Sequence, residues 1–325
     1  MNLPAELQAA IQEALAASGT SHRALAAAAA RLSRRYRGPD PGGGAGWQPA
    51  ALGAYLATRL PATWAATWTA LSAAAAARPG WRPRTLLDIG GGPGTAMWAA
   101  ALVWPGLEQV RVVERDARMV AVGRRLGQQA AHPAVREAAW IVSDAGEALP
   151  GDPADLVVAA YVVGELGEAA RARLVGRLWG LADLLVVVEP GTPEGAQAVL
   201  AARQAVLAVG GHTLAPCPHD AACPLSRPDW CHFAARVART KLHRQLKGGQ
   251  APYEDEKFSY GAWAREPPQG APSRILRHPR ADPGRIQLTL CTPGGAADVV
   301  ATRSGADFKA ARKARWGGPW PPASR

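Results

Sequence analysis

The chain has 325 residues, a formal net charge of +11 and a sequence pI near 10.1. This length is enough to bury a full core, either in one large domain with additions or in two domains. The positive charge indicates an acidic partner, usually nucleic acid, whereas no membrane span is expected, because the longest uncharged stretch, Leu60 to Ala77, is mostly Ala and Thr.

Residues 1–84 are predicted to form an N-terminal helical region. A helix is predicted over 3–17, where four-residue spacing places on one face Leu3, Leu7, Ile11 and Leu15. A second helix is predicted over 21–36, then a Gly/Pro linker over 38–46. The Ala-rich helical block that follows carries aromatic side chains that we expect to pack in the core, namely Tyr55, Trp64 and Trp68. Because no basic-then-apolar signal is present, we expect a cytoplasmic protein with reduced cysteines. We also expect a monomer.

From Thr85 onward, predicted strands and helices alternate, which is typical of an α/β fold with a parallel sheet. Strands are predicted at 86–89, 110–113, 140–142, 156–160 and 184–188. Helices are predicted between and after them, at 95–103, 117–130, 165–180 and 194–209. The resulting Rossmann-like core is predicted to cover residues 85–211.

The first predicted strand leads into a glycine-dense turn, Asp88-Ile89-Gly90-Gly91-Gly92-Pro93-Gly94-Thr95. Glycines allow the backbone to approach a ligand, and the following helix presents its first N–H groups to that ligand. The spacing differs from the dinucleotide fingerprint and resembles motif I of class I S-adenosylmethionine (SAM) methyltransferases. We therefore predict a SAM site at Asp88, Gly90, Gly92 and Gly94; an ordinary glycine-rich turn is the alternative.

Two acidic residues extend this predicted SAM site. Glu114 ends the second strand, twenty residues beyond Gly94, where such folds place a carboxylate on the ribose hydroxyls; Asp116 is a competing candidate. Asp144 follows the third strand and, by the resemblance to SAM enzymes, contacts the adenine amino group. Either acid could instead be an ordinary surface residue.

All four cysteines fall into one pattern, predicted to form a metal site in an insertion over 212–250. Three follow the spacing C-x5-C-x7-C and the fourth comes much later, the set being Cys217, Cys223, Cys231 and Cys291. Structural zinc prefers shorter spacings, whereas wider, proline-flanked loops and four thiolates suit an iron–sulfur cluster. Zinc, with His219 or His232 replacing a cysteine, and unligated thiols are the alternatives; otherwise the two histidines assist the site or contact RNA.

Two short basic segments, 227–247 and 303–325, each have a net charge of +5. Within the first, residues 233–247 are interpreted as a basic helix beside the metal site that presents Arg236, Arg239, His243 and Lys247. The second, a basic C-terminal tail, is interpreted as a helix interleaved with aromatic residues that presents Lys309, Arg312, Lys313 and Arg315. Together they predict RNA contacts, although solvated surfaces are the alternative.

Residues 251–302 are predicted to close the core sheet with strands at 257–260, 274–276 and 285–291. Cys291 would then lie at the end of a sheet strand and attach the insertion to the core.

Several segments together resemble one family: Ala215-Pro216-Cys217-Pro218-His219, Trp230-Cys231-His232-Phe233, Lys257-Phe258-Ser259-Tyr260, Leu290-Cys291-Thr292-Pro293 and Arg312-Lys313-Ala314-Arg315-Trp316-Gly317. The chain is similar, over roughly residues 50 to 318, to a bacterial member of the methyltransferase-like family associated with the mitochondrial small ribosomal subunit. The resemblance implies a SAM-methyltransferase fold, a four-cysteine [4Fe–4S] cluster and a role on small-subunit ribosomal RNA during ribosome assembly. The first 46 residues depart from it, with no transit-peptide character.

The sequence assigns no catalytic residue. Base N-methylation typically uses an Asn/Asp-Pro-Pro-aromatic loop after the fourth strand, but here that loop reads Tyr161-Val162-Val163-Gly164-Glu165. Cytosine C5 methylation needs a nucleophilic cysteine, and a cluster would occupy all four. Tyr161 and Glu165 line the expected pocket, or else serve packing and capping. Two hypotheses remain: an rRNA methyltransferase, or a non-catalytic RNA-binding assembly factor. A DNA-binding or redox-sensing regulator is disfavoured, since no helix-turn-helix arrangement is found.

Overall fold

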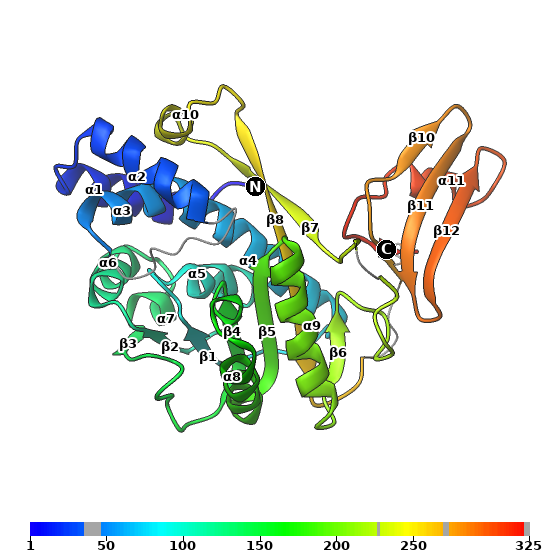
Figure 1. Ribbon diagram of the computed structural model, residues 1–325, viewed down its shortest axis with the longest axis horizontal. Coiled ribbons are helices and arrows are strands. Elements are labelled where there is room, and N and C mark those ends of the chain that lie inside the picture. The colour runs from blue at the N-terminus through cyan, green and yellow to red at the C-terminus, as the bar shows by residue number, and fades with distance from the viewer. Residues whose placement is uncertain (36–46, 226–227, 269–272, 322–325) are drawn as a thin grey trace.

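The computed structural model describes residues 1–35, 47–225, 228–268 and 273–321, so the predicted linker over 38–46 lies outside the described residues. Its central element is an eight-stranded sheet in the order β3-β2-β1-β4-β5-β8-β6, with β7 also paired to β8 (Figure 1). The strands are β1 Thr85–Ile89, β2 Gln109–Glu114, β3 Ala139–Val142, β4 Ala154–Ala160, β5 Ala182–Pro190, β6 His212–Ala215, β7 Phe233–Ala238 and β8 Tyr253–Ala264. Strands β1 to β5 are parallel, whereas β8 runs antiparallel to its neighbours.

Helices cover both faces of this sheet because successive strand residues point to opposite sides. Leu86 and Val158 pack into the apolar cluster beneath the N-terminal helices and α5, whereas Leu87 and Val157 pack into the cluster beneath α8 and α9. The helices of the core are α5 Thr95–Val103, α6 Ala117–Gly127, α7 Pro133–Arg136, the short 3-10 helix η2 Val163–Glu165, α8 Glu168–Leu181 and α9 Pro193–Leu207. The predicted parallel α/β core is therefore confirmed.

The N-terminal region is helical, as predicted. It contains α1 Ala5–Ala17, α2 His22–Arg35, α3 Pro49–Ala54, the π-helix η1 Tyr55–Arg59 and α4 Leu60–Ala77. The predicted core packing of the aromatic residues is confirmed for Trp64, which is buried and stacked on Trp68 with ring centroids 6.3 Å apart. Among the described residues, no helix is both long and apolar enough to cross a membrane.

A second, five-stranded sheet follows the core and lies to one side of it (Figure 1). It consists of β9 Ser273–Ile275, β10 Arg280–Asp282, β11 Arg285–Thr292, β12 Gly295–Thr302 and β13 Pro319–Trp320, with the short helix α11 Phe308–Ala311. Its own apolar cluster includes Leu288, Leu290 and Trp320. The strands predicted at 274–276 and 285–291 therefore do not close the core sheet, because they pair with each other in the second sheet. Strands β6 and β8 close the core sheet instead.

The basic helix predicted over residues 233–247 is wrong in its first half. Residues Phe233–Ala238 form strand β7, and only Lys241–Lys247 form a helix, α10. Phe233 and Val237 lie four apart, a spacing that fits one face of a helix and also one face of a strand. Their alternation with the more exposed Arg236 follows the two-residue period of a strand.

Candidate functional site

The glycine loop has the backbone geometry of a ligand-binding turn. Gly90, Gly92 and Gly94 have φ angles of 60°, 55° and 84°, a left-handed region that other residues rarely adopt. A side chain at Gly90 would place its Cβ 2.4 Å from Cγ2 of Val162. Helix α5 begins directly after the loop, so its first N–H groups face the carboxyl end of β1.

Asp88 lies beneath this loop and is fully buried. Burial raises the pKa of its carboxyl to about 7, and the N–H groups of Met97 and Ala96 offset only part of this effect. Neither carboxylate oxygen has a well-formed hydrogen bond among the described residues. Since buried polar groups are normally satisfied, this carboxylate indicates a site that a polar ligand or water completes.

Glu114 meets the glycine loop at the end of β2. Its Oε2 accepts a hydrogen bond of 2.9 Å from the N–H of Gly92, and its Oε1 accepts one of 2.8 Å from the N–H of Asp116. Burial raises the pKa of Glu114 despite these two donors. The competing residue, Asp116, caps α6 by accepting from the N–H groups of Arg118 and Met119. The structure therefore places Glu114 at the loop, with lone pairs left for ligand hydroxyls.

Asp144 lies farther out, in the loop after β3. Its Oδ1 accepts a hydrogen bond of 2.8 Å from the N–H of Gly146, and its Oδ2 lies 4.0 Å from Nη1 of Arg115. Arg115 also pairs with Glu165 at 3.6 Å. The arginine thus connects the loops after β3 and β4, and the adenine contact of Asp144 stays a prediction.

The N-terminal region contributes a wall of the glycine-loop site that the sequence analysis did not predict. The hydroxyl of Tyr55 lies 3.8 Å from the position that a Cβ on Gly92 would occupy. The ring of Trp47 packs edge-on against that of Tyr55 with centroids 5.2 Å apart, and the N–H of Trp47 donates to Asp116 at 3.5 Å. No local motif signals this contact, since it joins segments distant in sequence.

The loop after β4 is held by a second acid that sequence reasoning missed. Glu189, at the carboxyl end of β5, is 1% exposed and accepts a hydrogen bond of 3.0 Å from the N–H of Val162. Burial raises the pKa of Glu189 to about 7, although the N–H groups of residues 162–164 act against this shift. Its position at a strand end, like that of Glu114, is the signal that could have found it.

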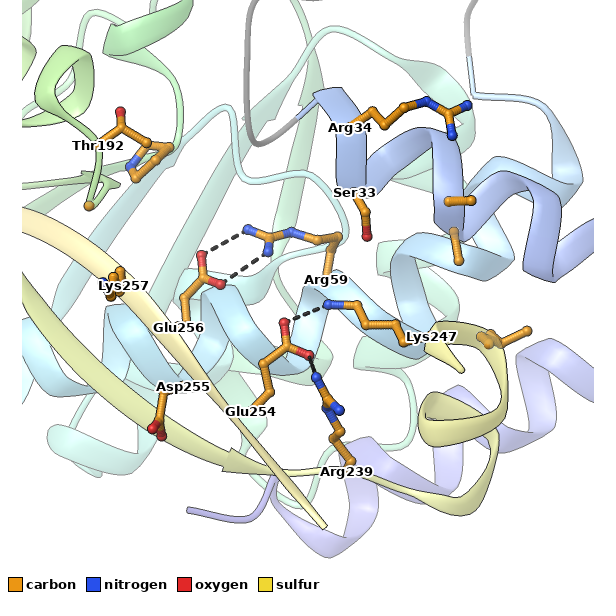
Figure 2. A pocket seen from close by; sticks show the side chains of 15 residues that line it. Ser33, Arg34, Arg59, Thr192, Arg239, Lys247, Glu254, Asp255, Glu256 and Lys257 are labelled. Atoms are coloured by element: carbon orange, nitrogen blue, oxygen red, sulfur yellow. Dashed lines mark hydrogen bonds and ion pairs between the residues drawn. The ribbon is translucent and has the colours of Figure 1, made fainter. Parts of the chain in front are cut away.

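Tyr161 connects this loop to a buried ion pair. It has a φ of 61°, and its hydroxyl donates to Oε1 of Glu256 at 3.1 Å. Glu256 in turn accepts two hydrogen bonds, of 2.9 and 3.0 Å, from the guanidinium of Arg59, as the dashed lines in Figure 2 show. A chain of contacts therefore runs from the glycine loop through Tyr161 to the π-helix.

The four cysteines converge between the core and the second sheet. Cys217 follows β6, Cys231 precedes β7, Cys223 lies in the loop between them, and Cys291 lies in β11. Burial, followed by the charges of the other three thiols, raises the pKa of Cys231 well above its usual value. Within the described residues, no three His, Cys, Asp or Glu side chains are close enough together to hold one metal ion. The predicted cysteine site is thus gathered in one region, without coordination geometry.

Buried arginines surround this cysteine segment. Arg203, from α9, donates to the carbonyl oxygens of His219 and Ala221, and Arg274, from β9, donates to that of Pro216. Burial raises the pKa of Cys217, while the charges of both arginines lower it. The two arginines therefore offset only part of the upward shift that burial causes, and the thiol form remains favoured.

Other contacts fix the cysteine segment to its neighbours. Nε2 of His219 lies 3.4 Å from Sγ of Cys291. His232 instead stacks on Trp230, with ring centroids 5.2 Å apart. The indole N–H of Trp230 donates to the carbonyl oxygen of Gly191 at 3.0 Å. The segment is thus tied both to the second sheet and to the loop after β5.

Three cations of the first basic segment are paired with acids within the molecule. Arg236 forms two hydrogen bonds of 2.7 Å with Asp255, and Glu254 accepts from Arg239 at 2.9 Å and Lys247 at 2.5 Å. Burial would raise the pKa of Glu254, but its bonds to His243 and Lys247 hold it well below its usual range. The prediction that these side chains share one exposed basic face is therefore wrong. They neutralise the acidic start of β8 instead.

The C-terminal segment is different. Its helix is a single turn, Phe308–Ala311, rather than the predicted longer element. Its four cations are exposed and have no ion-pair partner within the described residues, namely Lys309, Arg312, Lys313 and Arg315. This segment therefore carries four cations that are not neutralised by ion pairs within the described residues.

Comparison with known proteins places this arrangement in a family. The model of the mitochondrial small ribosomal subunit family Rsm22 matches residues 49–321. The chain belongs to the Rsm22 family. The human protein named ribosome assembly protein METTL17, mitochondrial, is 31% identical over 291 residues, which are 81% of this chain and 61% of that protein. The chain thus spans about three fifths of the length of this relative.

Several solved structures similar to this Rsm22-family chain are named as methyltransferases. Magnesium protoporphyrin IX methyltransferase from Synechocystis PCC 6803 with bound SAM has 13% identity and a TM-score of 0.42, covering 63% of this chain and 80% of that one. The plantazolicin methyltransferase BpumL in complex with SAH has 12% identity and a TM-score of 0.41, covering 80% and 99%. The strand order of the core, with antiparallel β8 between β5 and β6, is itself that of class I SAM methyltransferases.

Proposed function

We propose that this chain binds SAM through its methyltransferase fold and acts on small-subunit ribosomal RNA during ribosome assembly. The observation that carries the proposal is a group of four exposed cations without an ion-pair partner among the described residues, next to a sheet added to a core with a SAM-type glycine loop. Membership of the Rsm22 family and the name of the human relative support it.

The SAM site would be formed by Asp88, Gly90, Gly92, Gly94, Glu114 and Asp144. The unsatisfied oxygens of Asp88 and the remaining lone pairs of Glu114 suit the polar groups of an adenosine ligand. When bound, SAM supplies an electrophilic methyl group. Calorimetry with SAM and SAH tests the site, and the absence of binding by the folded chain would contradict it.

A [4Fe–4S] cluster on Cys217, Cys223, Cys231 and Cys291 is part of the proposal. Four thiols near two buried arginines suit an anionic iron–sulfur group, which fixes loops by joining them to one centre. Zinc is the alternative, with His219 beside Cys291 as a possible fourth ligand. Iron and acid-labile sulfide should both be stoichiometric after anaerobic purification. Stoichiometric zinc without sulfide would exclude the cluster.

RNA contact is assigned to the tail rather than to the first basic segment. Changing Arg312, Lys313 and Arg315 to Gln should weaken RNA binding and reduce the slope of log affinity against log salt by about 2. A matched control removes three exposed arginines elsewhere, Arg23, Arg82 and Arg173. An equal effect in both variants would mean that total charge, and not the tail, binds RNA.

A non-catalytic assembly factor is the second candidate function, and the loop after β4 favours it. That loop lacks an Asn/Asp-Pro-Pro-aromatic motif, and the hydroxyl of Tyr161 is bonded to Glu256. Modified nucleosides of small-subunit RNA should be compared between cells with and without the gene. A lost methyl group identifies the methyltransferase, whereas a subunit-assembly defect with an unchanged modification profile identifies the non-catalytic factor.

A further inference from the structure

A cavity of about 720 Å³ lies outside the glycine loop and the cysteine segment. The end of α2, the π-helix, the loop after β5, the end of α10 and the start of β8 form its walls (Figure 2). The Arg59–Glu256 ion pair belongs to its lining and is bonded through Glu256 to Tyr161. Pro190, at the carboxyl end of β5, also lines the cavity, which therefore lies at the edge of the sheet where ligands of α/β folds bind.

The charge of the lining favours an anion. Each of its three acids is already paired: Glu256 with Arg59, Glu254 with Arg239 and Lys247, and Asp255 with Arg236. Two further lining cations, Arg34 and Lys257, are exposed and have no ion-pair partner in the part of the chain that the structure describes. Figure 2 shows them on different walls of the cavity. The charge available to a ligand is thus positive.

The remaining lining suits a flat organic group. Ala29, Ala30, Pro190 and Leu246 contribute apolar surface next to the hydroxyl-bearing Thr192. The volume falls within the range of about 300–1,000 Å³ that small-molecule sites occupy. A cavity with apolar walls and separated cations at its edge matches a nucleoside with phosphate groups better than an acidic peptide, whose carboxylates are spaced along a chain.

We propose that this cavity holds one unstacked nucleotide of a single-stranded RNA segment, with its flanking phosphates on Arg34 and Lys257. The inference rests on the proposed RNA binding, but not on methyl transfer. Single-stranded regions are where proteins extract individual RNA bases. The nucleotide would lie beside the Arg59–Glu256 ion pair, to which the hydroxyl of Tyr161 is bonded.

The test uses the full chain and a fluorescent ten-nucleotide single-stranded RNA. Changing Arg34 and Lys257 to Gln should weaken binding at least fivefold and reduce the salt slope by about 1.4, from two lost phosphate contacts. The matched control changes Arg23 and Arg173 to Gln, two exposed arginines outside the cavity. Ala30→Leu, which fills the cavity without changing charge, should weaken binding at an unchanged slope.

The outcomes separate the inference from the proposed function. If the chain binds RNA and the cavity variants bind like the control, the inference falls and the RNA function stands. If the chain binds no RNA, uridine 5′-monophosphate is titrated into the protein and its binding is measured by ligand-detected NMR. This experiment tests the nucleotide site independently of RNA binding. Binding that the Arg34/Lys257 variant loses supports a nucleotide site without RNA function. No binding, or binding only of an acidic peptide used as a second probe, overturns the inference.

Discussion

Replacing Glu189 by Gln should stabilise the protein in a strongly pH-dependent way. This carboxyl is 1% exposed, and burial raises its pKa from an ordinary value of 4.5 to about 7. A Gln side chain resembles the neutral acid in shape and can still accept from the N–H of Val162. The substitution therefore removes the cost of the buried charge while keeping that contact.

The raised pKa of Glu189 determines how the stability gain of the variant changes with pH. Above pH 7 the carboxyl is ionised in both folded and unfolded chains, and the folded state carries the full cost of the buried charge. As the pH falls through 7 toward 4.5, the folded state takes up its proton first, so the cost disappears. At 1.36 kcal/mol per pKa unit, Glu189→Gln should raise the free energy of unfolding by about 3 kcal/mol at pH 8 but only about 1 kcal/mol at pH 5.

Urea unfolding of the parent chain and of the variant at pH 5, 6, 7 and 8 measures this difference. Because other titrating groups contribute equally to both proteins, their effects cancel in the comparison. Glu147→Gln, at an exposed position, serves as the control. A gain from Glu189→Gln that is the same at every pH would refute the assignment of a buried, charge-destabilised carboxylate.

Two further predictions concern the glycine loop and the buried ion pair. Gly90→Ala should abolish SAH binding measured by calorimetry, because the new Cβ would lie 2.4 Å from Val162. Gly80→Ala is the control: Gly80 also has a positive φ, but no atom lies near its Cβ position, so SAH binding should remain intact. Arg59→Met should lower the free energy of unfolding by about 3–5 kcal/mol by leaving Glu256 unpaired, whereas the double variant Arg59→Met/Glu256→Met should recover most of it. Equal losses in the single and double variants would argue against a coupled pair.

The sequence predicted the core best where local pattern decides structure. Strands β1, β4 and β5 are mostly apolar and buried, and Glu114 and Glu189 lie at the ends of β2 and β5. The turn Asp88–Thr95 could be predicted because its positive φ angles require glycine, and the glycines are visible in the sequence. Strand β7 was missed because Phe233 and Val237 satisfy two periods at once, and only the pairing with β8 selects one of them.

The prediction of surface charge failed for a related reason. Arg236, Arg239 and Lys247 look like a free basic face until β8 brings Glu254 and Asp255 beside them. Net charge over a short window does not show which cations meet acids from elsewhere in the chain. The tail cations remained exposed because β11 and β12, next to α11, offer no such acidic run.

The hydrogen bond from Trp230 to Gly191 joins the cysteine segment to the wall of the cavity. Trp230 precedes Cys231, whereas Gly191 belongs to the wall of the cavity and also donates its N–H to Lys257. A group that orders the cysteine segment therefore restricts this wall as well. By linkage, a ligand in the cavity and a group held by the thiols would then each strengthen the binding of the other.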